Sequence, residues 1–152
     1  MPISQFDFFQ LLSTLVKNEV DFIVVGGVGA VLQGAPLSTF DLDIVHSQES
    51  QNLKRLKVAL DELNSSLREH KNRTIKPTLK HLASKGHLLL NSDAGPIDIL
   101  AWIGDNKRYD CLLPHTVILK LDDEMAIKVL NLATIIETKI SADRPKDKLH
   151  IS

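Results

Sequence analysis

The chain has 152 residues, with 18 Lys and Arg against 19 Asp and Glu, so its formal net charge is −1 at pH 7. This charge balance argues against a protein that coats nucleic acid through bulk charge. Cys111 is the only cysteine, which excludes an internal disulfide and a cysteine-based zinc site and fits a reducing cytoplasm. No segment has the roughly 18 to 20 apolar residues that span a bilayer. We therefore expect one domain over residues 1–152, in the cytoplasm and without a membrane partner.

The first half of the chain alternates helical and strand patterns. Residues 3–18 have apolar side chains at helical spacing and predict an amphipathic helix capped by Ser4. The expected core face of this helix is Phe6, Phe9, Leu12 and Val16. The run "VDFIVVGG" predicts a buried strand that ends at Gly26 and Gly27, and "DLDIVH" predicts a second strand.

Two helices are predicted around and after this second strand. Residues 30–33 favour a short helix that ends near Gly34, because glycine and the proline that follows interrupt a helix. A longer helix is expected to open at Ser47. Its buried face is predicted to be Leu53, Leu56, Leu60 and Leu63.

The second half of the chain predicts two strand pairs and a last helix. Residues 68–85 hold six Lys and Arg against one acid, Glu69. This stretch is expected to be partly loop and partly edge strand, either solvated or in contact with RNA or substrate. "HLLLNSDAGPIDILAWI" predicts a β-hairpin with its turn at 93–96, and "TVILKLDDEMAIKVLN" predicts another strand pair. Residues 130–142 predict a helix whose shared face is Leu132, Ile136 and Ile140. The order of elements predicts an α/β fold of the α+β kind, with a mixed sheet flanked by helices.

Asp41 and Asp43 lie inside the second predicted strand. Because side chains alternate across a strand, both carboxylates point to the same side, with Cα atoms roughly 7 Å apart. Burying a carboxylate without a partner is costly, and two like charges repel each other. A divalent cation removes both penalties, and Mg²⁺ prefers such hard oxygen ligands. The pair therefore predicts a magnesium site.

Further residues extend this predicted site. Gly26 and Gly27 are expected at a strand-to-helix turn, where the missing side chains let phosphate approach backbone N–H groups. Ser38 and Thr39 lie just before the acids and are expected to add hydroxyl contacts. Asp98 lies in the apolar run "PIDIL". If this strand lies beside "DLDIV", Asp98 completes a three-carboxylate cluster that clamps a nucleoside triphosphate and accepts the proton of an attacking hydroxyl.

The run "GG…DLDIV" with a later "IDI" resembles the nucleotidyltransferase superfamily, which has the polymerase-beta-like fold. The chain is most similar to small prokaryotic members, including the toxin-type enzymes of toxin–antitoxin and abortive-infection systems. "ETKISADRPKDK" resembles their C-terminal lysine followed by Arg…Lys-Asp. The resemblance covers residues 20–147. It implies transfer of a nucleoside monophosphate from a triphosphate such as ATP to an acceptor hydroxyl of tRNA, a protein or a small molecule.

The resemblance also implies roles for single residues. One or two Mg²⁺ ions would be bound by Asp41, Asp43 and Asp98. Asp98 would also act as base, and Lys139 would neutralise triphosphate charge. Asp147 would orient Lys139 or the acceptor. The nucleotide would be held by Gly26, Gly27, Ser38, Thr39 and Lys139. A cognate partner protein is a further expectation.

Two departures from the family pattern leave an alternative open. Many relatives have an arginine before the residues that correspond to Asp41 and Asp43, where this chain has "APLSTF", and the chain ends five residues after Asp147. The alternative is a catalytically degenerate copy, such as an antitoxin, that binds nucleotide or a partner without turnover. A dinucleotide fingerprint is disfavoured, because Leu32 stands in place of its third glycine. Trp102 and Cys111 are expected in the core, and His46 is expected to pack or to form a strand-end hydrogen bond.

Overall fold

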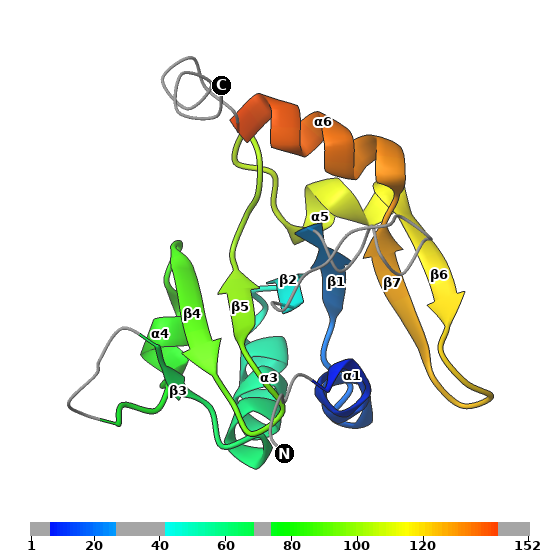
Figure 1. Ribbon diagram of the computed structural model, residues 1–152. Helices are drawn as coiled ribbons and strands as arrows, with labels where there is room; N and C mark the ends of the chain where they lie inside the picture. The colour runs from blue at the N-terminus through cyan, green and yellow to red at the C-terminus, as the bar shows by residue number, and fades with distance from the viewer. Residues whose placement is uncertain (1–6, 27–41, 69–73, 143–152) are drawn as a thin grey trace.

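The computed structural model describes residues 7–26, 42–68 and 74–142. Its centre is a seven-stranded mixed sheet in the order β3-β4-β5-β2-β1-β7-β6 (Figure 1). The strands are β1 (Phe22–Val25), β2 (Leu42–His46), β3 (Ser66–Leu67), β4 (His87–Asn91), β5 (Ile97–Leu100), β6 (Thr116–Lys120) and β7 (Ala126–Leu130). The helices are α1 (Phe8–Lys17), α3 (Ser50–Glu62), α4 (Leu79–Ala83), α5 (Tyr109–Leu112) and α6 (Leu132–Ala142), with a 3₁₀ turn at Leu113–His115. The predicted mixed sheet flanked by helices is confirmed.

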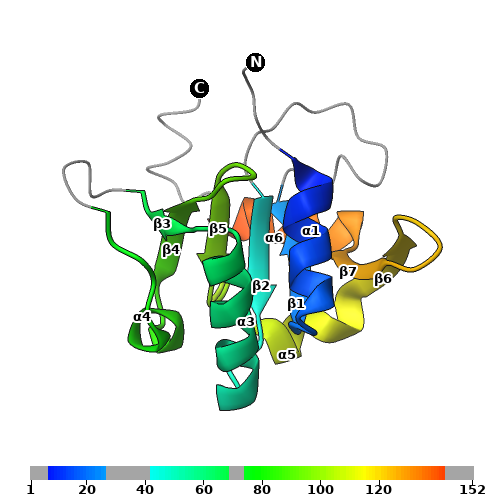
Figure 2. The ribbon, with the colours of Figure 1, turned by 90° about the horizontal axis from the view of Figure 1, so that it is seen from below.

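Helices cover both faces of this sheet. Figure 2 shows α1 and α3 in front of the strands and α6 behind them. The core on the α1 and α3 side includes Leu11, Leu15, Leu42, Ile44, Leu56, Leu60, Ile97 and Ile99. The core on the α5 and α6 side includes Ile23, Val25, Val45, Leu100, Leu112, Leu130 and Ile135. Because β1 is covered on both faces, all four of its residues are buried, as its unbroken apolar run requires.

Both predicted strand pairs are present. Strands β4 and β5 pair antiparallel, as do β6 and β7. Strand β1 lies between β2, to which it is antiparallel, and β7, to which it is parallel. Strand β5 lies directly beside β2 and runs parallel to it. This last pairing joins the sequence runs "DLDIV" and "PIDIL" in one sheet.

The first helix begins later than the sequence predicted. Asp7 is its N-cap residue, and the Asp7 carboxylate accepts a hydrogen bond of 3.0 Å from the Gln10 backbone N–H. Because a side-chain acceptor already caps Phe8–Lys17, the prediction of Ser4 as the cap was wrong. Of the predicted core face, Leu12 is buried and Val16 packs against the core, but the Phe9 side chain is 52% exposed. The buried side chains are Leu11, Leu12, Thr14 and Leu15.

Three other helical predictions need correction. Helix α3 begins at Ser50 rather than at Ser47, although all four leucines of its predicted face are buried. Helix α4 forms in the stretch expected to be loop and edge strand, because Thr78 and His81 make a reciprocal capping box. In α6, Ile136 is 57% exposed while the neighbouring Ile135 packs on the sheet, so the predicted face was wrong. The predicted helix at 30–33 lies outside the described residues.

Two residues expected in the core lie elsewhere. Cys111 is exposed. Trp102 is half-buried at the end of β5, and its Nε1–H donates a hydrogen bond of 2.9 Å to the Lys85 carbonyl oxygen. His46 is buried as expected, and its ring Nδ1 lies 3.1 Å from the Ser47 carbonyl oxygen. Within residues 7–26, 42–68 and 74–142, none of the helices has the length and apolar character needed to cross a membrane.

One buried amide ties the central strands to helix α3. Asn52 is fully buried, and its Oδ1 accepts a hydrogen bond of 2.6 Å from the Asp21 backbone N–H. Its Nδ2 donates to the Asp21 carbonyl at 3.1 Å and to the Ser47 carbonyl at 2.8 Å. Asp21 precedes β1 and Ser47 follows β2. Asn52 therefore fixes the start of one strand against the end of its neighbour.

Candidate active site

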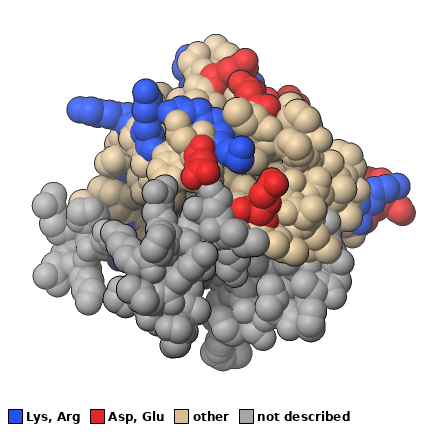
Figure 3. Space-filling model, turned by 90° about the horizontal axis from the view of Figure 1, so that it is seen from above, with Lys and Arg blue, Asp and Glu red and all other residues tan. Residues whose placement is uncertain are grey.

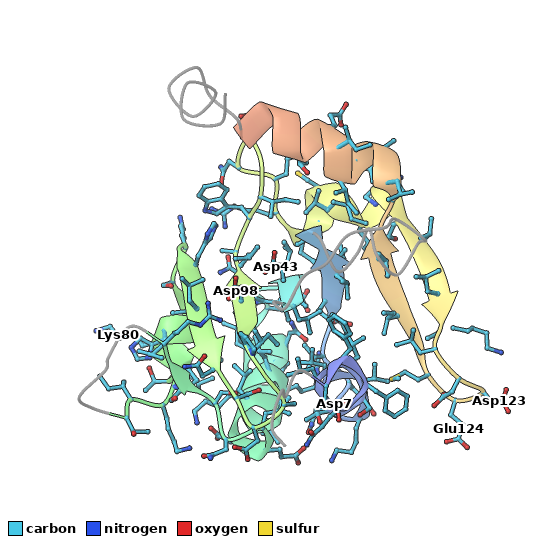
Figure 4. All side chains as sticks on the ribbon, in the orientation of Figure 1. Asp7, Asp43, Lys80, Asp98, Asp123 and Glu124 are labelled. Carbon is cyan, nitrogen blue, oxygen red and sulfur yellow. The ribbon has the colours of Figure 1, made fainter. Side chains whose placement is uncertain are left out.

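Asp43 and Asp98 occupy paired positions on β2 and β5. Paired residues of neighbouring strands project to the same face, and neighbouring strands lie about 4.8 Å apart. Both side chains lie on the face that α5 and α6 cover, because Val45 and Leu100, two residues further along each strand, belong to that core. Figure 4 shows the two carboxylates beside each other. Sheet pairing therefore brings together two acids that are distant in the sequence.

The end of β1 lies against this acid pair. Val25 is the register partner of Asp43, and Gly26 follows with a φ of +73°. A Cβ atom added to Gly26 would lie 2.5 Å from Asp43 Oδ2. Only glycine accepts both this backbone conformation and this close approach without strain. The strand therefore ends in bare backbone next to a carboxylate.

A basic side chain also reaches the acid pair. Arg68 Nη2 lies 2.8 Å from Asp98 Oδ1 and donates a second hydrogen bond, of 2.7 Å, to the Leu90 carbonyl oxygen. Arg68 is the first residue of the basic stretch 68–85, which the sequence predicts to be solvated or in contact with RNA or substrate. Its contact with Asp98 was missed, because a residue at the end of a two-residue strand carries no pattern that predicts pairing across β4.

The other predicted site residues are not part of this described geometry. Lys139 lies in α6, the helix on the same side of the sheet as Asp43 and Asp98, and only its backbone is described. Five predicted site residues lie outside the described residues, namely Gly27, Ser38, Thr39, Asp41 and Asp147. In the described part of the chain, no group of three or more His, Cys, Asp or Glu side chains could hold a metal ion. Two of the three predicted ligands are thus brought together.

The donor set fits a hard divalent cation. It offers two carboxylates from adjacent strands, and the backbone of Gly26 approaches one of them closely. Mg²⁺ takes one or two carboxylates and completes its shell with waters and substrate phosphates.

Seen from above, Lys and Arg side chains gather on one side of the molecule, near acidic side chains, and much of the remaining described surface is uncharged (Figure 3).

A pocket of about 320 Å³ lies at the opposite end of β2, and His46, Arg108 and Tyr109 are among the residues that line it. Burial lowers the pKa of His46 below its ordinary value, against the opposing effect of its backbone hydrogen bond. Burial also raises the pKa of Tyr109, with nearby acids, Asp21 first, adding to the effect. This pocket does not include Asp43 or Asp98, so it is separate from the acid pair.

Comparison with known proteins bears on the fold. No protein-family model matches the chain, and no curated protein matches it. Among solved structures, the fold is similar to that of TM1012 from Thermotoga maritima, which is described as a candidate nucleotidyltransferase. The TM-score is 0.60 at 16% sequence identity, over 94% of this chain and 86% of the other. At this identity the similarity speaks for the fold alone. The chain has a nucleotidyltransferase-like fold.

Proposed function

We propose that this protein is a magnesium-dependent nucleotidyltransferase that moves a nucleoside monophosphate from a nucleoside triphosphate to an acceptor hydroxyl. The observation that carries the proposal is the register pairing of Asp43 with Asp98, with Gly26 against the Asp43 carboxylate. Two carboxylates on one face, with the Gly26 backbone close to one of them, suit a metal-bound triphosphate, because Mg²⁺ takes carboxylate oxygens and completes its shell with phosphate oxygens. The nucleotidyltransferase-like fold supports the same chemistry.

Each residue has a proposed task in this reaction. Asp43 and Asp98 hold Mg²⁺ together with Asp41, and the turn at Gly26 and Gly27 binds triphosphate oxygens through backbone N–H groups. When bound, Mg²⁺ supplies charge neutralisation and polarisation of the reacting oxygens. Asp98 accepts the acceptor's hydroxyl proton as the new bond from oxygen to the α-phosphorus forms. The bond from that phosphorus to the bridging oxygen breaks, and pyrophosphate leaves.

The remaining residues have supporting tasks in the proposal. Lys139 neutralises triphosphate charge from helix α6, and Asp147 orients Lys139 or the acceptor. Ser38 and Thr39 add hydroxyl contacts to the nucleotide. The proposed acceptor is tRNA or a protein, in a cytoplasmic toxin–antitoxin setting in which a cognate partner restrains the enzyme.

A labelling experiment tests the proposal. The purified full chain is incubated with Mg²⁺, each of the four α-³²P-labelled ribonucleoside triphosphates in turn, and either tRNA or cell extract as acceptor. We expect label in one acceptor, with release of pyrophosphate, and loss of label in the variant Asp41→Ala, Asp43→Ala. Asp93→Asn, which changes an exposed turn acid bonded to Asn64, serves as the control that should retain transfer.

The same experiment separates the alternative of a binding module without turnover. A degenerate copy would bind triphosphate, measured by calorimetry, and transfer no label to any acceptor. A nucleotide-binding antitoxin would in addition form a tight complex with a co-expressed protein, which a pull-down from the native source would recover. Triphosphate binding without label transfer to any acceptor would refute the proposed enzyme, whereas a complex by itself would not, because the proposed enzyme also has a cognate partner.

A further inference from the structure

Arg68 belongs to one row of side-chain positions that crosses four strands. The Arg68 backbone N–H donates to the Leu89 carbonyl at 2.8 Å, so Arg68 continues the pairing of β3 with β4. Leu89 is the register partner of Asp98, and Asp98 is the register partner of Asp43. Residues paired in this way project to one face of the sheet. The guanidinium of Arg68 therefore extends over β4 and meets Asp98 on the face where Asp43 also lies.

This ion pair is partly withdrawn from water. The side chains of Arg68 and Asp98 are 27% and 15% exposed. Charges at such positions are less screened by salt than the ions of a fully exposed pair. Arg68 Nη2 is shared between Asp98 and a backbone carbonyl, while its buried Nε has no hydrogen-bond partner among the described residues. The guanidinium is thus held at the acid pair by a short contact in a partly buried place.

The charge of Arg68 changes what the acid pair can bind. With ionised Asp43 and Asp98 alone, the described site would carry two negative charges, and Arg68 cancels one of them. A divalent cation held by Asp98 would also lie close to the guanidinium, and like charges repel. A nucleoside triphosphate brings several negative charges of its own and shifts this balance back in favour of the cation.

We propose that Arg68 is the internal counter-ion of Asp98 and weakens binding of a free divalent cation until a triphosphate is present. The inference rests on the proposed function for the identity of the ion site. Arg68 acts through Asp98, so it is a positioning residue rather than a catalytic one. The expected consequence of this counter-ion is that the divalent cation binds together with the nucleotide rather than before it.

Binding of Mn²⁺ to the nucleotide-free full chain tests the proposal, with free Mn²⁺ measured by electron paramagnetic resonance. We expect Arg68→Gln to bind Mn²⁺ about tenfold more tightly than the natural sequence, because removing one nearby like charge from a partly exposed site is worth on the order of 1.4 kcal/mol. Arg68→Lys keeps the charge and should bind as weakly as the natural sequence. Adding Asp98→Asn to Arg68→Gln should abolish the gain.

The matched control is Arg55→Gln, which removes the same charge from α3 on the opposite face, where Arg55 pairs with Asp21 at 3.7 Å. It should leave Mn²⁺ affinity unchanged. Thermal unfolding in EDTA shows whether each variant is folded. If Arg68→Gln does not fold, Arg68→Met retains an apolar stem and takes its place with the same expected gain. Unchanged or weaker Mn²⁺ binding in the charge-removing variant would overturn the proposal, as would an equal gain in Arg68→Lys.

This measurement does not depend on turnover, so the two proposals can fail separately. Tighter Mn²⁺ binding in Arg68→Gln, without label transfer by the natural sequence, would support the counter-ion and refute the enzyme. Label transfer by the natural sequence, with Mn²⁺ affinity unaffected by Arg68→Gln, would refute only the counter-ion.

Discussion

Asp43 and Asp98 are register partners on adjacent parallel strands, and both project to the face of the sheet that α5 and α6 cover. The residues that flank each acid point into the opposite core, so neither strand can slip by one position without placing a carboxylate among the aliphatic side chains of α1 and α3. The geometry of the acid pair is thus fixed by the packing of its neighbours. This coupling makes the site open to direct mutational tests.

Replacing Asp98 tests its proposed role as ligand and base. Asp98→Asn keeps the shape of the side chain and an oxygen that can accept from Arg68, but it removes the negative charge. We expect the rate of label transfer to fall by at least about 100-fold, which is the size of effect that losing a general base produces. Asp93→Asn provides the matched control. Substantial transfer by a folded Asp98→Asn variant would contradict the assigned role.

Adding a methyl group at Gly26 tests the close approach of backbone to the acid pair. Gly26→Ala places a Cβ atom 2.5 Å from Asp43 Oδ2, at a φ of +73°. We expect the free energy of unfolding to fall by about 1–2 kcal/mol from the backbone conformation, and further from the contact. Urea unfolding followed by circular dichroism measures the change.

A double-mutant cycle separates these two causes of the Gly26→Ala effect. In an Asp43→Ala background the contact disappears and only the backbone strain remains, so Gly26→Ala should then destabilise less. Gly86→Ala is the control, since a Cβ atom there would meet nothing within 4 Å. Equal losses in both backgrounds would show that Asp43 does not restrict the residue at position 26.

Asn52 is expected to be a major contributor to stability. Asn52→Ala removes the partners of three hydrogen bonds to the backbone of Asp21 and Ser47. Because leaving buried and partly buried backbone groups unsatisfied is costly, the free energy of unfolding should fall by about 2–4 kcal/mol. Gln51→Ala, at the exposed neighbouring position of the same helix, should change it by less than about 0.5 kcal/mol. Similar urea midpoints for the two variants would argue against a stabilising role for the Asn52 hydrogen bonds.

His46 should make stability depend on pH. Burial lowers its pKa in the folded chain below the ordinary 6.5, so the unfolded chain binds a proton more readily than the folded chain does. The stabilising contribution of the neutral ring is therefore complete above about pH 6.5 and decreases as the pH falls through 6.5 toward the lower folded pKa. Urea unfolding at pH 7.5 and pH 5.5 measures it. In His46→Gln this part of the loss should vanish, and an unchanged pH dependence would contradict the assignment to His46.

Local sequence patterns predicted the positions of the strands and helices better than they predicted which face of each helix is buried. The strand runs and both hairpins follow from apolar runs bounded by turn residues, and these predictions are confirmed. The predicted core face was wrong for α6 and partly wrong for α1, where Leu12 is buried as predicted but Phe9 is exposed. Apolar residues lie on several sides of each helix, and only the neighbouring elements decide which side is buried. The short helices α4 and α5 were missed because a segment of four or five residues is too short to show a helical period in its sequence.

The sequence by itself predicted a buried strand that contains Asp43, a preceding strand that ends at Gly26, and a later apolar strand that contains Asp98. Only the tertiary structure decided that β5 lies beside β2, that the registers place Asp43 next to Asp98, and that Arg68 reaches Asp98 across β4. The physical reason is that period and composition act along the chain. Strand order and register, in contrast, depend on which surfaces bury each other after the chain has folded back on itself.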